Sequence, residues 1–192
     1  MLPLYTGRHQ RRSLLWQYAA TGLFFDVLIL VLKGVLHLSY QWTGNLFVLV
    51  EFALFTFIYR EVAHLPRTLL LTAAGCAAAF FIGHTAISGA IVFNTVGASL
   101  FYCFYILYAL TGFRHLLRAP TEQYVTRLPA FWLYVGILIY SAGCILIFLS
   151  KDFLRGTDDV FFLFLWSTVF RLLNITKNSF LAIALSKTAA VK

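Results

Sequence analysis

Long apolar stretches, separated by short polar segments, make up most of this chain. Six of them approach the 20 or so residues that a helix needs to cross the hydrocarbon core of a bilayer. The pattern predicts transmembrane helices at 14–35, 42–59, 68–87, 90–110, 130–149 and 160–185. We therefore expect an all-α fold, an integral membrane bundle of six helices that forms a single domain.

The third and fourth stretches differ in the size of their side chains. The third reads "LLLTAAGCAAAFFIGH" and includes Gly75 and Ala79, whereas the fourth contains the bulky run "FYCFYILYAL". Small residues let helix backbones approach closely in lipid. The third helix is therefore expected to be central, with its Ala/Gly face buried, and the fourth is expected to face lipid in part. Only the short segment around "SGA" separates them, which predicts a tight hairpin.

Composition supports a membrane protein. Hydrophobic residues make up 61% of the chain and charged residues 11%, and the mean hydropathy is +0.84. An average soluble domain has about 25% charged residues. Water is therefore not the solvent for most of this surface, and we expect a multi-pass protein of the cell membrane whose first partner is the lipid bilayer.

The net charge of +8 is explained by topology rather than by nucleic-acid binding. Lys and Arg concentrate in the cytoplasmic loops of membrane proteins. With the N-terminus inside, ten lie in inner segments: Arg8, Arg11, Arg12, Arg60, Arg67, Arg114, Arg118, Arg127, Lys187 and Lys192. Three lie in outer segments: Lys33, Lys151 and Arg155. Both termini are therefore expected in the cytoplasm, and no nucleic-acid partner is expected.

Three ionisable residues fall deep within the predicted helices, namely Asp26, Glu51 and Arg171. At a rise of about 1.5 Å per residue, each lies roughly 12–16 Å below the outer face of the bilayer core. A charge at the bilayer centre costs about 2.5–3.5 kcal/mol even on the lenient insertion scale, so such residues pair or face the bundle interior. We expect Arg171 to pair with Asp26 or Glu51.

The sixth helix carries a polar stripe. Ser167, Arg171, Asn174 and Asn178 are spaced at i, i+4, i+7 and i+11, which places them on one helix face. This face is expected to point inward. Lys177 lies off the stripe and nearer the cytoplasm, so its long side chain is expected to reach the interface.

This charged cluster has two interpretations. It can hold the helices in register, or it can form a pocket or polar path, because intramembrane charges often mark functional sites. Two acids against one base favour a proton or cation, although one of the acids can also be protonated. Secondary polar positions are His84 and Asn94, near the outer end of the third and fourth helices.

Recognised cofactor and metal motifs are not found. The chain contains no Walker A, H-E-x-x-H or G-x-S-x-G sequence. The three cysteines, Cys76, Cys103 and Cys144, lie inside apolar runs and are interpreted as packing residues. No cofactor, metal or catalytic residue is therefore expected.

Three segments together resemble a known group of proteins: "NLFVLVEFALFTFIYREV", "FWLYVGILIYSAGCILIF" and "LWSTVFRLLNITKNSFLAIAL". They are similar to uncharacterised bacterial polytopic membrane proteins and to the membrane sensor regions of histidine kinases. The similarity covers about residues 45–185. It implies a sensory or regulatory membrane module, placed in the cell inner membrane, and supplies no catalytic residues.

Three functions remain open at this stage. The first is a non-enzymatic module that senses or couples to a membrane protein partner or a second copy of itself. The second is a small transporter or channel for a proton, a cation or a small polar solute, with Asp26, Glu51 and Arg171 as its midplane site. The third is a lipid-modifying enzyme, for which Glu61 and His64 are the only acid–base candidates near an interface.

Overall fold

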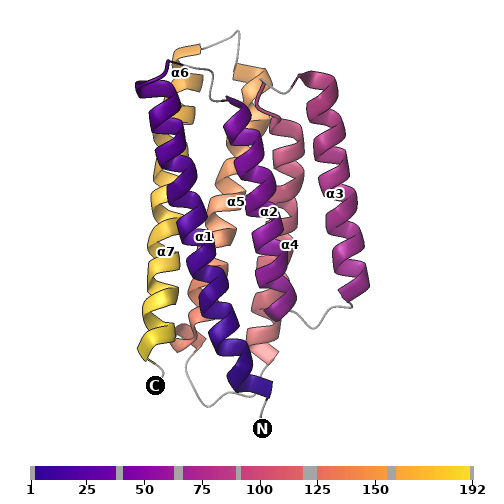
Figure 1. Ribbon diagram of the computed structural model, residues 1–192, viewed down its shortest axis with the longest axis vertical. Coiled ribbons are helices and arrows are strands. Elements are labelled where there is room, and N and C mark those ends of the chain that lie inside the picture. The colour runs from indigo at the N-terminus through magenta and orange to yellow at the C-terminus, as the bar shows by residue number, and fades with distance from the viewer. Residues whose placement is uncertain are drawn as a thin grey trace. The chain divides into compact units, whose positions relative to one another are not determined.

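The computed structural model describes residues 3–37, 41–62, 67–89, 92–118, 125–154 and 159–190. The regular elements in these ranges are helices: α1 (Pro3–Gly34), α2 (Gln41–Val62), α3 (Arg67–Ser88), α4 (Thr95–Arg118), the 3₁₀ turn η1 (Val125–Arg127), α5 (Pro129–Leu154), α6 (Asp159–Phe164), the π-helix η2 (Leu165–Val169) and α7 (Phe170–Ala190), as Figure 1 shows. The helices α1 to α5 each contain a segment long and apolar enough to cross a membrane. The chain forms two compact units, unit 1 (Met1–Ala98) and unit 2 (Ser99–Lys192).

All six predicted stretches are helical, but α4 begins at Thr95 instead of residue 90. The reason is an N-cap. The side-chain Oδ1 of Asn94 accepts a hydrogen bond of 2.9 Å from the backbone N–H of Gly97, and Asn is among the strongest N-cap residues. The "SGA" turn contains Gly89 with φ +91°, a left-handed conformation that glycine adopts without strain.

The sixth predicted stretch is divided rather than regular. The backbone N–H of Phe170 bonds to the carbonyl of Leu165, five residues back, which closes the widened turn of η2. The helix α7 that follows is less apolar than α2 to α5, because it carries Arg171, Lys177 and Lys187. The sixth transmembrane helix therefore stays a prediction, while the other five predicted stretches all overlap apolar helices long enough to span a membrane, with α4 displaced toward the C-terminus.

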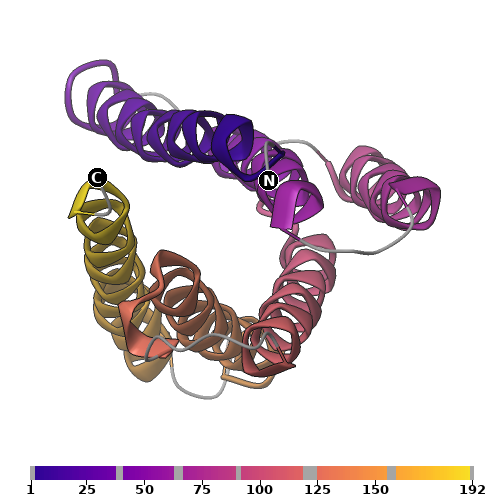
Figure 2. The ribbon, with the colours of Figure 1, turned by 90° about the horizontal axis from the view of Figure 1, so that it is seen from below.

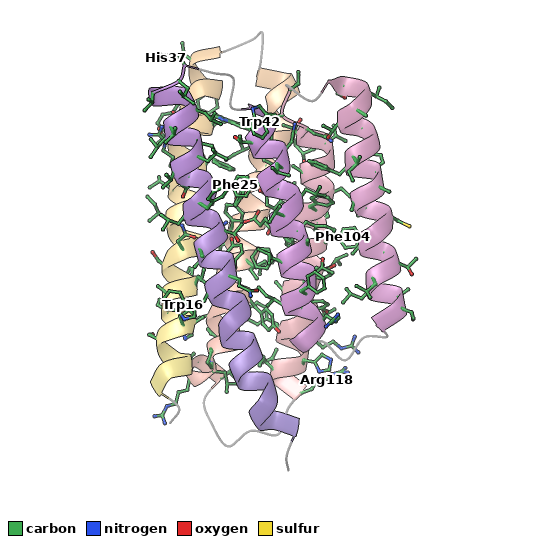
Figure 3. All side chains as sticks on the ribbon, in the orientation of Figure 1. Trp16, Phe25, His37, Trp42, Phe104 and Arg118 are labelled. Atoms are coloured by element: carbon green, nitrogen blue, oxygen red, sulfur yellow. The ribbon has the colours of Figure 1, made fainter. Side chains whose placement is uncertain are left out.

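In unit 1, α2 lies between α1 and α3 (Figure 2). The helices α1 and α2 run antiparallel, because Tyr18 meets Phe55 at 4.7 Å between ring centroids, and Phe25 meets Phe47 at 5.2 Å. Figure 3 shows Trp42 at the end of the unit where His37 lies, and Trp16 nearer the opposite end. Tryptophans near both ends of a bundle are typical of the aromatic belts of membrane proteins.

The prediction that α3 is the central helix is wrong. Only 22% of its apolar segment is buried, against 50% for those of α2 and α5. One stripe of α3 is buried, formed by Leu70, Ala74, Ala77 and Phe81. Gly75 and Ala79 fall between these positions and are exposed, because residues one or two apart from a buried position point away from the neighbouring helix.

In unit 2, α5 lies between α4 and α7 (Figure 2). The close approach comes from glycines of α5. A Cβ built on Gly136 would lie 2.7 Å from the Cβ of Phe180, and one on Gly143 would lie 2.6 Å from methyl groups of Leu173. Since the numbers rise on α5 as they fall on α7, the two helices are antiparallel.

The helix α4 has both exposed and buried side chains, and the expectation that it faces lipid in part stays a prediction. Exposed side chains include Leu107 and Leu110, but the aromatic run is mostly buried. Tyr102 and Tyr105 are each 1% exposed, and Phe101 is fully buried. The bulky residues of α4 therefore build much of the interior of unit 2, where Gly112 receives the ring of Tyr134 from α5.

Candidate functional site

Glu51 is the buried acid of unit 1. None of its surface is exposed. The hydroxyl of Tyr18, from α1, donates a hydrogen bond of 2.8 Å to its Oε1. The neighbouring positions on α2, Phe52 and Phe55, are also buried. An ionisable group in this apolar setting is costly unless it is hydrogen-bonded, so the bond from Tyr18 stabilises the buried carboxyl group.

The other two predicted intramembrane charges are less enclosed. Asp26 is exposed on α1, although the preceding residue, Phe25, is buried. Arg171 is exposed on α7. Asp26 and Glu51 therefore differ in burial, and the expected ion pair of Arg171 with Asp26 or Glu51 stays a prediction.

Asn94 organises the polar end of unit 1. Its backbone N–H donates to Oδ1 of Asn45 at 2.9 Å, and Nδ2 of Asn45 donates to the carbonyl of Val92 at 2.8 Å. Its own Nδ2 donates to the carbonyl of Phe81 and to Oγ1 of Thr85. Asn94 thus ties α2, α3 and the start of α4 together, which gives this predicted polar position a structural role.

His84, the second outer-side position, is half-buried on α3. Its Nδ1 lies 3.3 Å from Oγ of Ser88, and its ring lies 6.0 Å from that of Phe80. These contacts are local to one helix. The structure therefore places His84 and Asn94 on the same part of unit 1, but only Asn94 connects several helices.

Unit 2 contains a buried cation whose burial was not predicted from the sequence. Lys177 is 5% exposed, and its Nζ lies 4.1 Å from the ring centroid of Tyr140. The expectation that Lys177 reaches the interface is therefore wrong. The physical reason is the register of α7 on α5, which puts Lys177 on the same face as Leu173 and Phe180, the residues that meet the two glycines.

The predicted polar stripe occupies a different face of the sixth stretch. Ser167, Arg171 and Asn178 are exposed, and Asn174 is half-buried. The Nδ2 of Asn174 donates to the carbonyl of Phe170 within its own helix at 3.2 Å. The stripe therefore does not form the surface through which α7 packs on α5.

Hydroxyl groups also lie in the interior of unit 2. The hydroxyl oxygens of Tyr102 and Tyr140 lie 3.2 Å apart, joining α4 to α5. Ser141 is fully buried, and its Oγ has no hydrogen-bond partner within the described part of the chain.

Sequence reasoning missed these residues of unit 2. A signal does exist in the sequence. Gly136, Tyr140 and Gly143 are spaced at i, i+4 and i+7, and so are Leu173, Lys177 and Phe180, so each triplet lies on one helix face. Small residues on one helix predict close contact with a partner. To match the two triplets one has to know that α5 and α7 pack against each other, and the sequence pattern does not show which helices pack together.

The chemistry offered by the two units differs. Unit 1 presents a buried carboxyl with a phenol donor, and unit 2 presents a buried ammonium with hydroxyl groups. Among the described residues, no group of three or more His, Cys, Asp or Glu could hold a metal ion. Glu61 ends up near the C-terminus of α2 with its side chain outside the described set, and His64 also lies outside the described residues.

Comparisons with protein-family models, curated proteins and solved structures find no match to this chain. The resemblance to bacterial membrane sensor regions therefore stays an expectation from the sequence. Function has to be argued from the geometry of the two units.

Proposed function

We propose that this chain is a multi-pass membrane protein with six transmembrane helices and cytoplasmic termini, and that it works as a non-enzymatic sensory or regulatory module coupled to a membrane partner. The five apolar helices support the membrane location. The ten-to-three bias of Lys and Arg supports the orientation. The continuous helical run from Asp159 to Ala190 supports the sixth span, because 32 residues exceed the length that a bilayer core needs.

The observation that carries the proposal is the way each unit buries one ionisable side chain between helices. Glu51 receives a hydrogen bond from Tyr18, and Lys177 faces the ring of Tyr140. Each contact links two helices at their middle. A change at either group therefore alters how its two helices contact each other. A ligand or partner that binds one arrangement of the helices more tightly shifts the population of the protein toward that arrangement.

A transporter is the second candidate, favoured by the complete burial of Glu51. Acidic residues inside membrane helices commonly carry protons or cations. The module and the transporter differ in one respect, since only the transporter moves an ion across a sealed membrane.

Flux measured in sealed vesicles distinguishes them. The purified protein is reconstituted in liposomes that contain a pH-sensitive dye, and an ion gradient is applied. The module predicts proton and cation flux equal to that of protein-free liposomes. Flux that depends on the protein and is lost in Glu51→Gln would establish the transporter and overturn the module.

A partner is tested separately by extraction in native-lipid discs. The module predicts a membrane protein present in a fixed ratio to this chain, with a ratio unchanged at increasing wash stringency. Discs that hold this chain alone, in one or more copies, would contradict coupling to a different protein.

A further inference from the structure

One side of α7 carries polar groups that point away from α5. Arg171 and Asn178 are exposed, and so is Ala182, one turn further along. At about 100° per residue these three side chains fall within about 40° of one line on the helix, and Lys177, which packs on α5, points about 100–120° away from Arg171 and Asn178. We call Arg171, Asn178 and Ala182 the Arg171 face.

The hydrogen-bonding groups of the Arg171 face differ from the neighbouring hydroxyls of α7. The hydroxyls of Thr176, Ser179 and Ser186 donate to backbone carbonyls of their own helix, three or four residues back. Within the described part of the chain, no hydrogen bond, ion pair or ring contact involves Arg171 or Asn178. A guanidinium group has five N–H donors, and an asparagine side chain has both donors and an acceptor.

A location inside the bilayer makes such a face unfavourable against lipid. This inference rests on the proposed function, in which α7 belongs to the sixth span. Arg171 then lies 12 positions after Asp159, where the helical run begins, or roughly 18 Å along it. Charged side chains at such depth pair with other groups rather than face hydrocarbon, and asparagine side chains form hydrogen bonds between helices. The Arg171 face therefore requires a helix that covers it.

We propose that the Arg171 face docks a transmembrane helix of the partner protein, and that this helix carries an aspartate or glutamate at the depth of Arg171. A carboxylate accepts two parallel hydrogen bonds from one guanidinium group. Asn178 fits a polar side chain two turns further along the partner helix, and a small residue such as Ala182 lets the two backbones approach.

Charge also argues against a second copy of this chain as the occupant. Two copies that dock through the same face are related by a two-fold axis, so each residue at the centre of the contact meets its own counterpart. Arg171 would then lie beside Arg171 in a medium of low dielectric constant, where like charges repel strongly. An acidic partner helix supplies the opposite charge instead.

Synthetic helices of defined sequence test the recognition. The full chain, labelled with a donor fluorophore, is reconstituted in phosphatidylcholine liposomes with acceptor-labelled polyleucine peptides of about 20 residues. The peptides differ at their central residue, which is aspartate, leucine or lysine, and energy transfer measures association. The aspartate peptide should associate about ten-fold more tightly than the leucine peptide, near the upper range for a hydrogen bond between membrane helices. The lysine peptide should associate no more tightly than the leucine peptide.

Matched variants assign the association to the Arg171 face. Arg171→Leu should reduce association of the aspartate peptide to that of the leucine peptide, whereas Arg118→Leu, which removes an exposed cation at the end of α4, should not. Asn178→Leu should weaken association about three-fold, and Ser179→Ala should leave it unchanged, because that hydroxyl bonds to its own helix. Arg171→Glu should reverse the preference, so that the lysine peptide associates most tightly.

The comparison of peptides on the unaltered protein requires no variant, so it stays decisive where a variant does not fold. Equal association of the aspartate and leucine peptides would overturn the inference. Energy transfer between two labelled copies of the chain that is lost in Arg171→Leu would also overturn it, because a second copy would then be the occupant.

Two further occupants are excluded by stability measurements. Recovery of the stability lost in Arg171→Leu by a second change, Asp26→Asn or Glu51→Gln, would assign the pair to an acid of this chain and overturn the inference. Stabilisation by phosphatidylglycerol over phosphatidylcholine that disappears in Arg171→Leu would assign Arg171 to a lipid phosphate and overturn it as well.

Failure of this inference is distinguishable from failure of the proposed function. A partner protein that stays in fixed ratio with the Arg171→Leu variant in native-lipid discs would overturn the role of the Arg171 face and leave the module intact. Discs that hold the unaltered chain alone would overturn the coupled module, and with it the partner inferred from this face.

Discussion

The ammonium group of Lys177 lies 4.1 Å from the centre of the Tyr140 ring, inside the contact between α7 and α5. The ring face is the negative part of the aromatic quadrupole, and a desolvated contact of this kind contributes about 2 kcal/mol. Below and above this pair, the glycines of α5 receive Phe180 and Leu173. The cation is thus held at the middle of the closest helix pair of unit 2.

Substitution of Tyr140 separates the role of the ring from that of the hydroxyl. Tyr140→Phe keeps the ring face and removes the hydroxyl contact with Tyr102, so a loss of about 1 kcal/mol is expected. Tyr140→Leu also removes the ring beside a buried cation, and a loss of about 3 kcal/mol or more is expected. Thermal or denaturant unfolding in detergent measures both, and equal losses would show that the ring face contributes nothing.

Glycine substitutions test the packing of the two units. Gly136→Ala should destabilise unit 2 by about 1–3 kcal/mol, because the new methyl group would meet Phe180. Gly75→Ala should be neutral or stabilising by up to about 1 kcal/mol, because its Cβ would meet nothing within 4 Å and alanine favours the helix. Unfolding temperatures that change in the reverse order would restore α3 as the tightly packed helix.

The comparison between α3 and α5 shows what the sequence could predict. The positions of the helices could be predicted from the length of the apolar stretches alone, because a helix that crosses a bilayer needs about 20 apolar residues. The sequence did not predict which helix faces are buried, since Gly75 and Ala79 of α3 looked as suitable for close packing as Gly136 and Gly143 of α5. Which small face is covered depends on the residue that fills it from another helix, and that information lies elsewhere in the chain.

The candidate site shows the same limit of sequence reasoning. Glu51 was expected in the interior and is completely buried, because a carboxyl group in the middle of an apolar helix has few alternatives. Its donor Tyr18 was not expected, since it lies near the start of the predicted stretch 14–35, where a tyrosine is usually interfacial. Lys177 was placed at the interface for the same reason, although the register of α7 on α5 turns it inward.

Removal of the Tyr18 hydroxyl tests the interior of unit 1. Tyr18→Phe takes a hydrogen-bond donor from a fully buried carboxyl group, and we expect a loss of about 1–3 kcal/mol. Thr21→Ala is the control on the same helix, because Thr21 is only partly buried and bonds to its own backbone. Chemical unfolding should show a change within about 0.5 kcal/mol for the control. Two equal changes would count against an interior hydrogen bond.

Asn94 provides a prediction about the junction of three helices. Asn94→Ala removes the cap of α4 and the two bonds donated by Nδ2, so we expect a loss of about 2–4 kcal/mol. Asn94→Asp keeps a cap acceptor but loses the donor, and an intermediate loss is expected. Circular dichroism during heating measures the unfolding temperatures of both variants. A smaller loss of stability for Asn94→Ala than for Asn94→Asp would contradict the assigned cap.

The central claim, a six-span protein with cytoplasmic termini, is tested most directly by side-specific labelling of single cysteines. The background replaces the three native cysteines, Cys76, Cys103 and Cys144, and single cysteines are introduced at positions 12, 155 and 187. The account predicts that a membrane-impermeant maleimide labels position 155 from outside the cell, and positions 12 and 187 only from the cytoplasmic side. Labelling of 155 and 187 from the same side would show that the sixth helix does not cross the membrane and would contradict the account.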